Sequence, residues 1–300
     1  MLHLFISALL AFRSRHPWVE CVVWLITGWL AILTATLIAG LALHGLMAPG
    51  SWLRSLANMT PNVVGVGVVL FFGIRSTRSS PAAVLSLRRP PWRALPWVAL
   101  SSLCLALLAA ALNLWIERIL PMPEWVEDLF REALEYHTLP GFLGVFLFLV
   151  VAAPVSEELM FRGLFLHRLR EGYGRTAAIL GSALFFGAFH ILPWQVIGAT
   201  LVGIYLGWLL MRTESIFMTM ISHALFNLVP VTAAGLSEQM PMLRGLGAGT
   251  EEFHPGPGLL LGTVLALAAG ILGTLRATSR PSTLEPPGTT PASPAWPPPG

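Results

Sequence analysis

The chain has 300 residues, of which 55% are hydrophobic and only 11% are charged, and its formal net charge is +3. Soluble domains carry about 25% charged residues, so this composition excludes an ordinary soluble domain and indicates an integral membrane protein. The positive charge is small and dispersed, which argues against the basic patch that a nucleic-acid partner requires. We therefore expect the lipid bilayer, and no nucleic acid, as a partner.

Eight apolar stretches predict eight membrane-spanning helices, and hence an all-α, polytopic membrane protein. A span requires about 20 mostly apolar residues. The stretches lie near residues 20–47, 56–74, 95–116, 141–167, 176–192, 194–211, 215–235 and 257–275. The second is apolar without interruption only from Val63 to Ile74. Pro193 leaves open whether residues 176–211 form two spans or one broken unit.

The chain divides into five predicted segments. Residues 1–19 start with an apolar run that arginines follow, which is the wrong order for a signal peptide and predicts an N-terminal interfacial segment. Residues 20–135 hold the N-terminal transmembrane helices, and residues 136–235 hold the core that carries the polar motifs described below. Residues 236–276 form a loop and the last transmembrane helix. Residues 277–300 are rich in proline, which predicts a disordered tail.

The basic residues indicate the orientation in the membrane. All of them are arginines, and they gather near both ends of the chain and in alternate loops, whereas residues 117–135 are acidic. By the positive-inside rule, this distribution predicts that both termini are cytoplasmic. A chain rich in arginine and without lysine is typical of a bacterium with a GC-rich genome. We therefore expect a multi-pass protein of a bacterial inner membrane.

Three polar motifs interrupt the apolar stretches. They consist of Glu157, Glu158 and Arg162, then Phe186 and His190, then His223 and Asn227. Ionisable groups at membrane depth are costly and usually face the interior of the bundle, where they serve a function.

Helix geometry separates the two carboxylates. Glu158 and Arg162 are four residues apart, so they can pair on one face of a helix. Glu157 is rotated by about 100° from Glu158 and is free to point elsewhere. Phe186 precedes His190 by one turn and can pack on its imidazole.

The motifs are predicted to lie at similar depth. At about 1.5 Å per residue, Glu157 and His190 lie roughly 17 and 22 Å from the nearest cytoplasmic charge, and His223 and Asn227 roughly 14 and 20 Å. A carboxylate, two imidazoles and an amide on separate helices are thus expected to meet in one site.

Two kinds of chemistry suit such a set. A carboxylate beside an imidazole can activate water as a general base, while a second imidazole and an amide can donate hydrogen bonds to a developing oxyanion. Together, these groups would hydrolyse an acyl bond. Alternatively, Glu157, His190 and His223 could ligate Zn²⁺ and leave one position open for water. The residue types alone do not decide between the two.

The three motifs, EExxxR, FxxxH and HxxxN, resemble those of the CPBP family of intramembrane proteases, the CAAX-protease and bacteriocin-processing group also called Abi. The resemblance covers about residues 140–235. It implies that Glu157 and His190 activate the attacking water and that His223 and Asn227 stabilise the oxyanion.

The resemblance also implies that Glu158 and Arg162 support the site structurally, as Phe186 does by packing. Family members have been described both as metalloproteases and as metal-independent glutamate proteases, so the need for Zn²⁺ stays open. The expected substrate is a membrane-associated protein or peptide, cleaved by a CAAX-type intramembrane endopeptidase.

Two other classes of function are alternatives to a protease. The first is a non-proteolytic membrane scaffold or bacteriocin self-immunity protein that retains the site. The second is a proton-coupled transporter in which Glu and His form a relay, but the chain shows neither the internal repeat nor the line of polar groups that a transport path requires.

Overall fold

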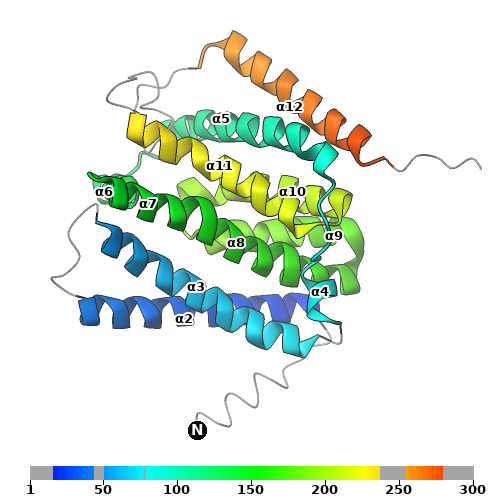
Figure 1. The fold of residues 1–300 in the computed structure, drawn as a ribbon, viewed down its shortest axis with the longest axis horizontal. Coiled ribbons are helices and arrows are strands. Elements are labelled where there is room, and N and C mark those ends of the chain that lie inside the picture. Colours follow the sequence, from blue (N-terminus) through cyan, green and yellow to red (C-terminus); the bar gives the residue numbers. More distant parts are fainter. Residues whose placement is uncertain (1–15, 44–50, 78, 237–254, 280–300) are drawn as a thin grey trace, which may run out of the picture.

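The computed structural model describes residues 16–43, 51–77, 79–236 and 255–279 (Figure 1). Within these ranges the regular structure is entirely helical, which confirms the predicted all-α class. Most of the expected interfacial segment and nearly all of the expected proline-rich tail lie outside the described residues.

The long helices follow the predicted spans. They are α2 (Pro17–Leu43), α3 (Trp52–Ser76), α5 (Leu95–Ile119), α9 (Leu166–Phe189), α10 (Pro193–Thr213), α11 (Ile216–Leu236) and α12 (Pro257–Ala277). Short elements join them, namely α4 (Pro81–Val84), the 3₁₀ turn η1 (Trp92–Ala94) and α6 (Glu124–Leu134). The segment before α9 consists of α7 (Leu139–Phe146), the π-helical η2 (Leu147–Ala152), α8 (Ala153–Glu158) and the π-helical η3 (Leu159–Phe165).

Seven helical stretches in the described ranges are long and apolar enough to cross a membrane, and one of them accounts for two predicted spans. This stretch, Leu139–Phe189, has 51 residues and is broken at Gly174, whose φ of 79° favours glycine. Its two halves pack side by side, because the Ser182 hydroxyl donates to the Phe161 carbonyl at 2.8 Å. The predicted spans 141–167 and 176–192 are therefore the two arms of one helical hairpin.

Residues 176–211 also form two helices and not one broken unit. Ile191 has a φ of 58°, in the left-handed region, and α10 starts at Pro193. The two helices approach closely where side chains are small, since a Cβ atom on Gly203 would lie 3.0 Å from the Ala183 Cα. Chain reversal and close packing thus bring α10 back along α9.

The helices lie side by side, with the motif-bearing ones in the middle (Figure 1). The pair α2 and α3 forms one edge of the bundle, α5 and α12 form the opposite edge, and α8 to α11 lie between them. The outer helices expose apolar side chains such as Leu33 and Leu37, which suits contact with lipid. The polar motifs are thereby shielded from lipid on both sides.

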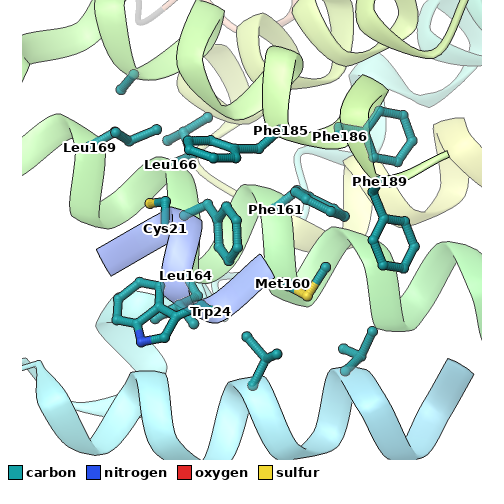
Figure 2. Close-up of a cluster of buried hydrophobic side chains, with 14 of the residues drawn as sticks. Cys21, Trp24, Met160, Phe161, Leu164, Leu166, Leu169, Phe185, Phe186 and Phe189 are labelled. Carbon is teal, nitrogen blue, oxygen red and sulfur yellow. The ribbon is translucent and has the colours of Figure 1, made fainter. Parts of the chain in front are cut away.

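An aromatic cluster fixes the contact between η3 and α9 (Figure 2). The Phe161 ring meets the rings of Phe165, Phe186 and Phe189 edge to face, with centroid separations of 5.2 to 5.4 Å. Such pairs contribute about 0.5–1.5 kcal/mol each beyond the area they bury. The second motif, which includes Phe186, is in this way held against the first.

Candidate active site

The first motif lies where α8 passes into η3. Glu158 and Arg162 are both fully buried, and Glu158 Oε1 lies 3.0 Å from Arg162 Nη1, so the pairing expected from their spacing is present. Buried charges are tolerated only when they are paired. Arg162 also contacts α10, because its Nη2 donates to the Gly203 carbonyl at 3.4 Å.

His223 on α11 joins this pair. Its Nδ1 lies 3.0 Å from Glu158 Oε1, and since the carboxylate paired with Arg162 acts as the acceptor, Nδ1 is the donor. This contact orients the ring so that Nε2 lies 3.9 Å from Glu157 Oε2. Glu157 and His223 are both buried, with 7% and 4% of their surface exposed. His223 therefore lies between the two neighbouring carboxylates, with its Nδ1 facing Glu158 and its Nε2 facing Glu157.

His190 directly follows the last residue of α9, Phe189, and is partly exposed. Its Nδ1 lies 2.9 Å from the Phe186 carbonyl, which can only accept, so Nδ1 carries a proton, and in the neutral imidazole Nε2 then keeps its lone pair. Among the described side chains, the imidazole in ion-pair range of Glu157 is that of His223 and not that of His190. The expected partnership of Glu157 with His190 is thus not a direct contact in this structure.

The Phe186 ring links the two imidazoles. It meets the His190 ring with a centroid separation of 4.8 Å and the His223 ring at 5.6 Å, at interplanar angles of 79° and 89°. The Arg162 guanidinium lies 4.3 Å from the centroid of the same ring. The expected packing of Phe186 on His190 is confirmed, and the contacts with His223 and Arg162 extend it to all three motifs.

Asn227 contacts the π-helical segment before the first motif. Its Nδ2 donates to the Leu149 carbonyl at 2.8 Å, and the side chain is partly exposed. An amide nitrogen carries two hydrogens, so one N–H remains for another acceptor. The contact fixes the amide at the edge of the site without using up its capacity to donate.

The proposed zinc ligands do not form a metal site as they stand. In the ranges 16–43, 51–77, 79–236 and 255–279, no three His, Cys, Asp or Glu side chains are grouped closely enough to hold a metal ion. Glu157 and His223 are close to each other, but His190 does not complete a set with them. The His223 Nδ1 is already engaged by Glu158.

Two residues that support the candidate site were not predicted from the motifs. Thr219 is fully buried one turn before His223 and faces Glu158, and its spacing of four residues from His223 and eight from Asn227 is a signal that could have revealed it. Ser156 donates to Asn62 Oδ1 on α3 at 3.0 Å, which ties α8 to the outer helix pair. No local pattern in the sequence indicates this contact, because the two residues are 94 positions apart.

The comparisons with known proteins concern the same helices. Residues 139–229 match a family model described as type II CAAX prenyl endopeptidase Rce1-like. The match runs from α7 into α11, includes every motif residue and lies within the predicted core 136–235. No curated protein and no solved structure matches the chain significantly.

Proposed function

We propose that the chain, whose residues 139–229 match the Rce1-like CAAX-protease family model, hydrolyses a peptide bond of a membrane-associated protein or peptide with a water molecule that Glu157 activates. The family match supports an intramembrane endopeptidase at the level of the family. The observation that carries the finer proposal is the His223 Nε2–Glu157 Oε2 separation of 3.9 Å in a buried setting. A water molecule beside both groups would be held by two polar partners.

Glu157 is the proposed general base. Glu158 is neutralised by Arg162 at 3.0 Å, which leaves Glu157 as the carboxylate that can accept a proton from water. The His190 Nε2 lone pair is also unused, so His190 can accept a hydrogen bond from the same water and orient it. After attack on the carbonyl carbon, the proton taken by Glu157 passes to the leaving amine, and the peptide bond breaks.

His223 and Asn227 are the proposed oxyanion donors. The Asn227 amide carries a second N–H besides the one that donates to Leu149. Donation from His223 Nε2 requires a proton on both ring nitrogens. In that form the positive charges of His223 and Arg162 balance the negative charges of Glu157 and Glu158, which is what a buried group of charges requires. Two donors aimed at the developing charge are typical of acyl-transfer sites.

The substrate and the membrane orientation are further parts of the proposal. The arginine distribution favours an inner-membrane protein with both termini cytoplasmic. The arginine-only, bacterial character of the sequence favours processing of an unprenylated membrane peptide, such as a bacteriocin precursor, over cleavage of a prenylated protein. A membrane peptide that enters the bundle from the bilayer would reach Glu157 without crossing the arginine-rich end.

A comparison of protein N-termini in the membrane proteome tests the proposal. Cells with the wild-type chain are compared with cells that carry Glu157→Gln, which keeps the shape of the side chain and removes the base. The cleavage products of the wild type should fall by about 10²–10⁴-fold, the contribution typical of a general base. Glu124→Gln, an exposed position on α6, is the matched control and should change nothing.

Two results would speak against this function. Undiminished cleavage by a folded Glu157→Gln variant would remove Glu157 from the mechanism. A Glu157→Gln chain that still complemented a deletion phenotype in full would favour the scaffold or self-immunity alternative.

A further inference from the structure

A cavity of about 310 Å³ opens at the arginine-rich end of the bundle and borders the candidate active site, with which it shares Arg162. Its walls come from three places in the chain, namely the loop after α4, the hairpin that η3 and α9 form around Gly174, and the end of α10. The loop is fixed to the α10–α11 turn, since the Ser215 hydroxyl donates to the Arg88 carbonyl at 2.8 Å and the Ile216 N–H to the Ser86 carbonyl at 3.2 Å. The cavity is therefore a built feature and not a gap beside a loose segment.

Positive charge predominates in this cavity. The arginines that line it are Arg88, Arg162, Arg170 and Arg175, and the one acidic lining residue is Glu214, which pairs with Arg88. The side chains of Arg170 and Arg175 both contact Met211 at the end of α10. Arg175 Nη2 donates to the Met211 carbonyl at 3.0 Å, and Arg170 Nη1 lies 3.9 Å from Met211 Sδ. Neither guanidinium pairs with a carboxylate in the described part of the chain.

Arg162 also lines the cavity and has unused donors. It is fully buried, and its Nε–H has no hydrogen-bond partner among the described residues. Its Nη1 faces Glu158, and its Nη2 makes the long contact to Gly203. An unpaired donor at such a place is costly unless a ligand completes it. Buried and exposed guanidinium groups thus line one cavity.

We propose that this cavity binds a phosphate group. Guanidinium groups recognise phosphate oxygens with paired N–H donors, and several of them converge here. The cavity lies at the ends of spanning helices, the level at which phospholipid headgroups lie, and basic pockets between transmembrane helices bind anionic lipid headgroups. The same chemistry would also hold a soluble phosphate, so the test separates the two sources.

The test uses the purified full-length chain in detergent, mixed with phosphatidylglycerol and phosphatidylcholine, and counts the lipids retained by native mass spectrometry. The wild type should retain phosphatidylglycerol in preference. Each guanidinium near an anionic headgroup contributes roughly a fivefold factor, so the Arg170→Gln, Arg175→Gln double variant should lose at least about tenfold of this preference. The Arg89→Gln, Arg93→Gln double variant, at two exposed arginines that do not line the cavity, is the charge-matched control and should keep this preference.

A second arm asks whether soluble phosphate suffices. The melting temperature in lipid-free detergent is compared in inorganic phosphate and in chloride of equal ionic strength. A rise in phosphate that the double variant lacks would support a site that also accepts free phosphate, whereas no rise together with selective lipid retention would assign the headgroup alone. Both results support a phosphate site.

Two other outcomes would overturn the proposed phosphate site. Equal lipid retention by the Arg170→Gln, Arg175→Gln variant and by the Arg89→Gln, Arg93→Gln control would show only a diffuse attraction. Stabilisation by a peptide with a free C-terminal carboxylate, but by neither phosphate nor phosphatidylglycerol, would reassign the cavity to a carboxylate. The side chains of Arg170 and Arg175 are both exposed, so their replacement should not disturb the fold. The melting temperature of the variant without added anions verifies that it is folded. If the double variant unfolds, Arg175→Gln alone can be compared with the wild type for lipid retention. No peptide is cleaved in these measurements, so their outcome is independent of the proposed hydrolysis.

Discussion

Removal of Arg162 probes the buried charge network directly. In Arg162→Met the side chain keeps its apolar length, but Glu158 loses its partner at 3.0 Å while it remains fully buried. Breaking a buried pair in this way costs about 3–5 kcal/mol, because one charge is left uncompensated. The contact of His223 with Glu158 at 3.0 Å offsets part of this cost, so we expect a loss near the lower end, about 3 kcal/mol.

The assay is a double-mutant cycle on the free energy of unfolding in mixed micelles. Glu158→Gln and the combination with Arg162→Met complete the cycle, and the double variant should be more stable than the sum of the single losses predicts, with a coupling of about 1–3 kcal/mol. A coupling below about 0.5 kcal/mol would refute the reasoning, because groups in direct contact do not behave independently. So small a coupling would mean that Glu158 and Arg162 are solvated or paired with other groups.

Three further predictions test the candidate active site and the helix packing around it. Asn227→Ala should lower the catalytic rate by about 10²–10³-fold with little change in the folding midpoint, and a rate within a factor of two of the wild type would exclude an oxyanion role. Phe186→Leu should lower the rate more than it weakens substrate binding, because the ring orients both imidazoles; steady-state kinetics that showed a change in KM alone would contradict this. Gly203→Val should destabilise the chain by about 1–3 kcal/mol, because its Cβ would lie 3.0 Å from the Ala183 Cα, whereas Gly198→Ala, with no atom within 4 Å of its Cβ, should be nearly neutral in the same unfolding assay.

Local spacing predicted those parts of the fold and site that depend on neighbours in sequence. The apolar stretches indicated the spans, and the four-residue separation indicated the Glu158–Arg162 contact, which the structure contains. The packing of Phe186 on His190 is local in the same sense.

Contacts between distant helices could not be predicted in this way. That His223 and not His190 lies beside Glu157 depends on the rotation of α11 about its axis, and no residue near either position records that rotation. The π-helical segments η2 and η3 add to the difficulty, because they change the helical phase on both sides of Glu157 and Glu158. The hydrogen bond from Asn227 to Leu149 in η2 is a consequence of this geometry.

The local nature of the Glu158–Arg162 pair also bears on how the chain enters the membrane during synthesis. Glu158 leaves the ribosome 65 residues ahead of His223, so α8 and η3 must insert before their partner on α11 exists. A span with a lone carboxylate would meet a barrier of about 2.5–3.5 kcal/mol at the translocon. With Arg162 one turn away, the span can neutralise that carboxylate within itself, and the later helices need only complete a polar centre that is already in place.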